Sequence, residues 1–104
     1  MSEIQKKNDE LRSQLPIFPR PHRLVMTQGI RAEFSAEDIL EILMQIKNTD
    51  KFDDGDDPWK EHDFGSFVFK DERIYWKFDY YDDELEYFKE NGTRVLTVML
   101  ASEY

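Results

Sequence analysis

A run of alternating residues in the second half of the chain constrains its fold more than any other feature. From Gly65 the sequence takes a period of two, which places Phe67 and Phe69 on one face of a strand. Residues 70–73 are expected to turn, and the strand that follows repeats the alternation. Its apolar face is made by Ile74, Trp76, Phe78 and Tyr80, and its other face by Tyr75, Lys77, Asp79 and Tyr81. The pattern predicts a β-hairpin with one buried aromatic face.

The strongest helical pattern lies at residues 35–48. Ser35 is suited to the N-cap position, and the acidic residues after it suit the positive end of a helix dipole. Apolar residues then recur at helical spacing as Ile39, Leu40, Leu43, Met44 and Ile46. We therefore expect one main helix here, with its apolar stripe on the sheet.

The first 23 residues predict a second helix and a connector. Residues 1–15 have the composition of a helix, but the apolar stripe is thin, so we expect it to pack lightly or to join an interface. Three prolines make residues 16–23 an extended connector, which Ile17 and Phe18 are suited to anchor on the core. His22, among prolines and arginines, is expected at the surface.

Two further strands complete the predicted fold. A short strand at 24–27 precedes Gly29, which marks a turn or bulge. A final strand at 93–101 is apolar on both faces, which is typical of a central strand or one covered by helices. The 104 residues therefore predict a single α+β domain with its core at 24–104. Its sheet is mostly antiparallel, with about four strands, and carries the 35–48 helix together with the N-terminal helix.

Composition excludes several classes of protein. The chain has no cysteine, which excludes disulfides, thiolate zinc sites and a cysteine nucleophile. No apolar run approaches the roughly 20 residues that span a bilayer, and the N-terminus lacks the apolar segment of a secretory signal. We therefore expect a cytoplasmic protein with no membrane partner.

The net charge of −9 is unevenly distributed along the chain. Residues 1–32 carry six basic and three acidic groups, so the remaining 72 residues hold a net charge of −12. A surface this acidic repels phosphates, so we expect no direct contact with nucleic acid.

Three segments carry a resemblance to a known family: DPWKEHDFGSF, YWKFDYYD with the LEY that follows it, and TRVLTVMLASEY. From about Leu24 to Tyr104 the chain is similar to a family of small uncharacterised bacterial proteins, classed as a domain of unknown function. The resemblance implies no activity and no catalytic residue. It implies a bacterial background of plasmids and phages, which favours accessory and anti-defence roles. It also marks the EHDFG segment at 61–65 as a feature of the fold.

The acidic stretch before the hairpin is a candidate for metal binding. Clustered carboxylates suit hard cations, and a histidine adds a transition-metal option. The candidates are Asp53, Asp54, Asp56, Asp57, Glu61, His62 and Asp63. The spacing does not match the calcium-binding loop, because Gly55 follows two adjacent acids. We therefore expect a solvated loop with no metal and no other cofactor.

Acid–base catalysis by His62 with Glu61 or Asp63 is the enzymatic alternative. Adjacent residues of a strand point to opposite faces, which argues against a shared substrate. The competing interpretation is that His62 hydrogen-bonds to backbone where the loop meets the strand, while Gly65 supplies the bend. No nucleophile or phosphate-binding motif occurs, so we expect no enzyme.

An aromatic sheet that stacks nucleobases is a further alternative. Its residues would be Tyr75, Trp76, Tyr80 and Tyr81. Sheets that bind RNA pair such rings with lysine and arginine, whereas acids flank these rings along the sequence.

We therefore expect a non-enzymatic, acidic protein-binding module. Carboxylates on a folded scaffold can replace phosphates and bind a basic groove. The expected partner is a basic nucleic-acid-binding protein or complex, and the sharper hypothesis is an inhibitor of anti-CRISPR or anti-restriction type that mimics nucleic acid. The expected contact residues are Asp53, Asp54, Asp56, Asp57, Glu61 and Asp63, with Trp59 as a packing anchor and further acids from 79–90. A homodimer built through the final strand or the N-terminal helix is the structural alternative.

Overall fold

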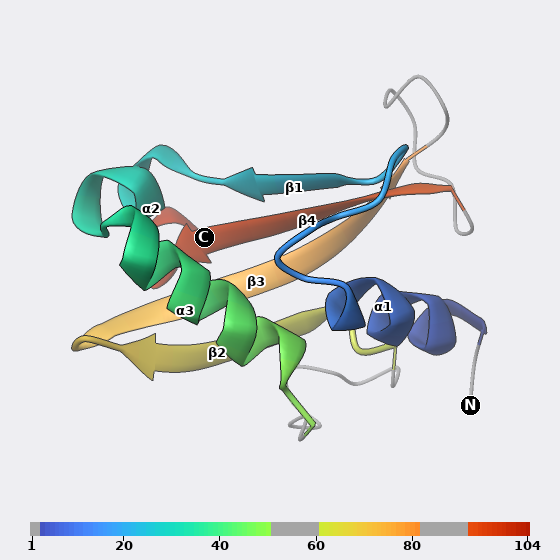
Figure 1. Ribbon diagram of the computed structural model, residues 1–104, viewed down its shortest axis with the longest axis horizontal. Coiled ribbons are helices and arrows are strands. Elements are labelled where there is room, and N and C mark those ends of the chain that lie inside the picture. The colour runs from blue at the N-terminus through green and yellow to red at the C-terminus, as the bar shows by residue number, and fades with distance from the viewer. Residues whose placement is uncertain (1–2, 51–60, 82–91) are drawn as a thin grey trace.

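The structure is a computed structural model that describes residues 3–50, 61–81 and 92–104 (Figure 1). The predicted α+β class is confirmed: helices and a four-stranded sheet form one compact unit. The elements are α1 (Glu3–Ser13), β1 (Arg23–Met26), α2 (Gln28–Glu33), α3 (Ala36–Lys47), β2 (Phe64–Phe69), β3 (Glu72–Tyr81), β4 (Thr93–Leu100) and the 3-10 turn η1 (Ala101–Glu103). Within these described residues, no helix is long and apolar enough to cross a membrane.

The sheet has the strand order β1-β4-β3-β2. β2 pairs with β3 and β3 with β4 in antiparallel fashion, while β1 runs parallel to β4. The expectation of a mostly antiparallel sheet is therefore confirmed. β4 lies between two strands, and Leu96 and Val98 have no exposed surface, as predicted for a central strand.

The core lies between the sheet and the helices α1 and α3, which cross the same face of the sheet (Figure 1). Ser35 caps α3 by accepting a hydrogen bond from the Asp38 amide, as its sequence predicts. The hairpin presents its predicted aromatic face to this core, because alternate residues of β3 share one side. The four residues of that face, all buried, are Ile74, Trp76, Phe78 and Tyr80.

The helix α1 packs more firmly than its thin stripe predicts. Ile4 and Leu11 of the helix are buried, as is Leu15 just after it, and two polar residues of the helix, Asn8 and Arg12, are buried beside them. The expectation of light packing was wrong because polar side chains complete the buried face, and hydrophobic periodicity does not register them.

The connector after α1 differs from its prediction at two positions. Phe18 packs against the core, with its ring centroid 6.4 Å from that of Phe78, but Ile17 is 79% exposed and anchors nothing. His22 is half-buried rather than a surface residue, because its Nδ1 accepts a hydrogen bond from the Arg94 amide at 3.0 Å.

Gly29 does not mark a turn or bulge; it lies inside α2. Thr27 caps this short helix, and the Glu103 carboxylate reaches it from the far end of the chain. The carboxylate accepts hydrogen bonds from the Thr27 hydroxyl at 2.6 Å, the Gly29 amide at 3.0 Å and the Leu100 amide at 2.9 Å. A side chain at Gly29 would meet that carboxylate, which explains the glycine.

Candidate functional site

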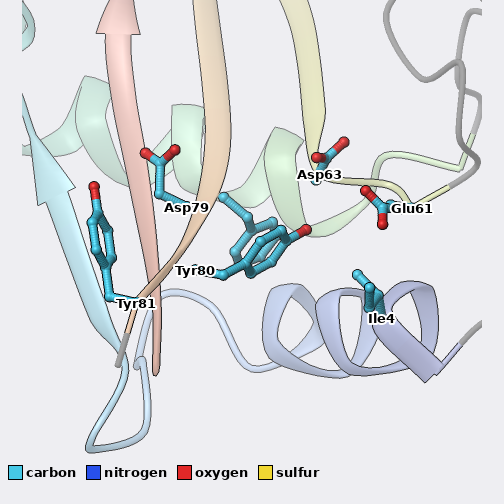
Figure 2. A pocket seen from close by; sticks show the side chains of 7 residues that line it. Ile4, Glu61, Asp63, Asp79, Tyr80 and Tyr81 are labelled. Atoms are coloured by element: carbon cyan, nitrogen blue, oxygen red, sulfur yellow. The ribbon is translucent and has the colours of Figure 1, made fainter. Parts of the chain in front are cut away.

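A pocket of about 660 Å³ lies at the end of the sheet where β3 extends past β2 (Figure 2). Its walls combine carboxylates with aromatic and aliphatic side chains. The residues that line it are Ile4, Glu61, Asp63, Phe78, Asp79, Tyr80 and Tyr81. In Figure 2 the Tyr80 ring lies between Asp79 on one side and Glu61 and Ile4 on the other.

The pocket forms where residues 61–63, which precede β2, turn away from the direction of that strand. The pairing of β2 with β3 begins at Phe64, opposite Lys77, and continues in one further bond from the Phe78 amide to the Asp63 carbonyl, at 2.8 Å. His62 then takes a positive φ of 55°, a conformation uncommon for residues other than glycine, and turns the chain toward α1. The prediction that Gly65 supplies this bend was wrong, because Gly65 lies within β2.

Asn8 of α1 holds the floor of the pocket in place. Its amide nitrogen donates to the Tyr80 hydroxyl at 2.9 Å and to the Glu61 carbonyl at 3.0 Å. Its amide oxygen accepts from Nε of Arg94 at 2.7 Å. One fully buried side chain therefore joins α1, β3, β4 and the segment before β2.

His62 is held by side chains of α1, and the backbone hydrogen bond expected for it from the sequence stays a prediction. Its Nδ1 lies 2.8 Å from Oδ1 of Asp9, and its Nε2 lies 3.0 Å from the amide nitrogen of Gln5. Both ring nitrogens thus face side chains of α1. The enzymatic alternative pairs His62 with Glu61 or Asp63, whereas the structure places the Asp9 carboxylate beside its Nδ1.

Arg12 fastens the other end of α1. Its guanidinium donates to the carbonyls of Ile46 and Thr49, at 2.9 and 3.0 Å, at the C-terminal end of α3. Carbonyl groups at the C-terminal end of a helix have no intrahelical donor, so they favour a nearby cation. The same group donates to Asp9 at 2.7 Å and lies over the Trp76 ring, 5.4 Å from its centroid.

Burial shifts the pKa of two groups beneath the pocket. It raises the pKa of the Tyr80 phenol above its ordinary value of 10.0, so the phenol is neutral at physiological pH by an even wider margin. Burial also lowers the pKa of Arg94, whose guanidinium lies over the Tyr80 ring at 5.1 Å. The charges that line the pocket are carboxylates, and Asp79 has a neighbour of opposite sign in Lys77, at 3.2 Å. The pocket therefore combines negative charge with aromatic walls.

The structure brings two of the predicted contact residues, Glu61 and Asp63, to one pocket. The other five lie outside the described residues: Asp53, Asp54, Asp56, Asp57 and Trp59. The described residues include no group of three or more histidine, aspartate or glutamate side chains arranged to hold a metal. Sequence reasoning missed Ile4 in the apolar wall, because it lies 57 or more positions before every other lining residue and carries no local signal of contact, and it assigned Phe78 only to the buried face of β3.

The base-stacking alternative as drawn from the sequence does not fit the geometry. Trp76 has no exposed surface and Tyr80 is 7% exposed, because both belong to the core face of β3. Tyr75 and Tyr81 lie on the opposite face and are partly exposed.

Comparison with known proteins identifies one family. The family described as "Protein of unknown function (DUF3768)" matches residues 26–103. No curated protein matches the chain, and no solved structure matches it either. The matched range contains β2, β3, β4, α2, α3 and most of the pocket, whereas α1 and most of β1 lie before it. Because the match covers most of its length, the chain belongs to the DUF3768 family of proteins of unknown function.

Proposed function

We propose that the protein is a non-enzymatic binding module that accepts a basic segment of another protein in its acidic pocket. One observation carries the proposal: Glu61, Asp63 and Asp79 line the same pocket as the aromatic side chains of β3. Carboxylates attract a cation, and aromatic faces favour its approach through cation–π contact. This combination suits a side chain that is both cationic and partly apolar.

An arginine side chain fits this description best. Its planar guanidinium forms paired hydrogen bonds with a carboxylate and stacks on aromatic rings, whereas a lysine ammonium is a more strongly hydrated point charge. The pocket volume of about 660 Å³ is within the range of ligand sites and leaves room for more than one side chain.

The sharper form of the proposal concerns the kind of partner. A net charge of −9 steers the molecule toward basic surfaces, and proteins that hold nucleic acid have such surfaces. In this form the protein occupies the groove of a nucleic-acid-handling defence complex, and the acids at 53–57 extend the contact made by the pocket.

The test is capture of partners from a nuclease-treated bacterial lysate, with elution by rising salt. A pocket variant, Glu61→Gln/Asp63→Asn/Asp79→Asn, is compared with a control, Glu33→Gln/Glu37→Gln/Glu41→Gln, which removes three exposed carboxylates of α2 and α3. Both variants change the net charge equally. We expect the wild type and the control to capture the same basic protein and the pocket variant to lose it. Equal capture by all three proteins would rule out the pocket as the binding site.

A further inference from the structure

On the face of the sheet that points away from α1 and α3, the charged side chains of the described strands are mostly basic, whereas the whole chain is acidic. Alternation along the strands assigns four charged side chains to this face: Arg23 of β1, and Arg73, Lys77 and Asp79 of β3. Three are basic and one is acidic, in a chain whose net charge is −9. Over the described strands, these charged side chains sum to +2, and the one acid, Asp79, lies at the border of the pocket and is paired with Lys77.

In the first half of β3, basic and aromatic residues alternate on this face. Arg73 is exposed and donates a hydrogen bond to the Ser66 hydroxyl at 3.2 Å, which orients its guanidinium across β2. Tyr75 follows, and then Lys77, whose side chain is 39% exposed beside Asp79. Residues two apart on a strand stand about 7 Å from one another. A ring with a cation on each side therefore lies along one strand.

Three aromatic rings meet around Tyr75. Phe64 of β2 and Tyr104, which follows η1, each pack edge-to-face against Tyr75 at a centroid distance of 5.3 Å. They also contact each other, at 5.6 Å. Tyr104 remains 73% exposed, so the group presents ring surface to solvent and is not part of the core.

We propose that this face of the sheet binds single-stranded nucleic acid. Phosphates are drawn to Arg23, Arg73 and Lys77, and unpaired bases stack on the rings of Tyr75 and Tyr104. Stacking needs only the flat face of a base, so a small aromatic group serves a single strand of any sequence. A duplex offers its phosphates but not its base faces, so the rings give no advantage to duplex binding.

Charge complementarity and the exposed aromatic rings together favour single-stranded nucleic acid as the ligand of this face. An acidic protein segment would satisfy the three cations, but it would not require exposed aromatic rings between them. The net charge of −9 predicts that the chain as a whole repels phosphates. The described strands nevertheless place three basic side chains on this one face of the sheet. The surface borders the acidic pocket at Asp79, but its three basic residues, Tyr75 and Tyr104 do not line that pocket, and the inference does not depend on the proposed function.

The test uses a fluorescein-labelled 20-nucleotide oligothymidylate and fluorescence anisotropy at low salt. We expect binding that weakens with salt, with a log–log slope of about −2 for three cations on a single strand. Arg73→Gln/Lys77→Gln should weaken binding at least tenfold. The matched control, Lys6→Gln/Lys7→Gln, removes two ion-paired lysines of α1 and should leave the affinity unchanged.

The contribution of the rings is tested with Tyr104→Ala, at a position that is 73% exposed, and with Tyr75→Leu, and a thermal melt checks the folding of each variant. Each should weaken oligothymidylate binding about fivefold or more. Neither should alter binding of polyglutamate, a probe with charge but no bases. The inference is overturned by absence of oligothymidylate binding, by an equal loss in the Lys6/Lys7 control, or by ring variants that bind as the wild type does.

Discussion

The indole of Trp76 lies directly over Gly65, its cross-strand partner in the hairpin, in the space that a side chain at position 65 would fill. A Cβ atom placed there would stand 2.5 Å from the indole ring. Trp76 has no exposed surface and is packed beneath the Arg12 guanidinium, so the ring has nowhere to move.

Gly65→Ala should therefore destabilise the fold by about 1–3 kcal/mol, the usual cost of overpacking a core. Urea unfolding at neutral pH measures the change. Ser66→Ala on the same strand is the control, because its side chain faces away from the core and should change stability by less than about 0.5 kcal/mol. Wild-type stability in Gly65→Ala would show that the ring can relocate.

The hairpin around this pair was predictable because its signal is local. Ile74, Trp76, Phe78 and Tyr80 alternate with more polar residues, and burial on one face is the direct consequence of that alternation. The helix α3 was predictable for the same reason. By contrast, α2 has six residues with a glycine among them, and its N-terminus is completed by Glu103, a residue 74 positions beyond Gly29.

The candidate site was predictable only in part. Glu61 and Asp63 stand out in the sequence as acids, but their meeting with Asp79 depends on where β2 begins opposite β3. The contact of His62 with Asp9 joins residues 53 positions apart, and Asn8 is a polar residue in the buried face of a helix. No periodicity or motif specifies such pairs, because the fold itself brings them together.

The contact of Glu103 with α2 should make stability fall in acid. The hydroxyl of Thr27 is the main cause that lowers the pKa of Glu103 from its ordinary value of 4.5, with the Leu100 and Gly29 amides adding to it. A lowered pKa in the folded state means that the stabilisation is present above pH 4.5 and is lost as the pH falls through the folded value. Thermal melts from pH 6 to pH 3 should show this loss in the wild type and a smaller one in Glu103→Gln.

The effect of Gly29→Ala on the stability of the fold should depend on the residue at position 103. In the wild type a Cβ at position 29 displaces the Glu103 carboxylate and its hydrogen bonds, which should destabilise the protein. In a Glu103→Ala background the space is vacant, and the better helix propensity of alanine should stabilise α2 by up to about 1 kcal/mol. A double-mutant cycle measured by urea unfolding tests this, and additive effects would contradict the proposed contact.

His22 should make the stability of the fold depend on pH in a second range, above the range set by Glu103. Burial is the main cause that lowers the pKa of His22 below 6.5, and the positive charges of Lys7 and Arg94 add to it. The unfolded chain therefore takes up the proton first as the pH falls, so stability should decrease below pH 6.5 until the folded pKa is reached. The Arg94 amide donates to Nδ1, which requires that nitrogen to carry no proton.

Proton NMR can test the His22 prediction directly, since the chain has two histidines. The His22 ring signal, assigned by its absence in His22→Gln, should titrate with a midpoint below 6.5. In His22→Gln, stability should no longer decrease between pH 6.5 and the lower pKa that His22 has in the folded protein. A His22 midpoint at or above 6.5 would contradict the buried, neutral ring.

Asn8→Ala should destabilise the docking of α1 more than any exposed substitution in that helix. The change removes one hydrogen bond each from Tyr80 and Glu61, and it removes the acceptor of Nε in the buried Arg94. A buried polar group that loses its partner costs about 1–3 kcal/mol. We expect a loss of global stability by urea unfolding and faster amide hydrogen exchange in α1. Ser13→Ala, at the exposed end of the same helix, is the control. Unchanged exchange in Asn8→Ala would show that Leu11, Leu15 and Arg12 hold the helix without this network.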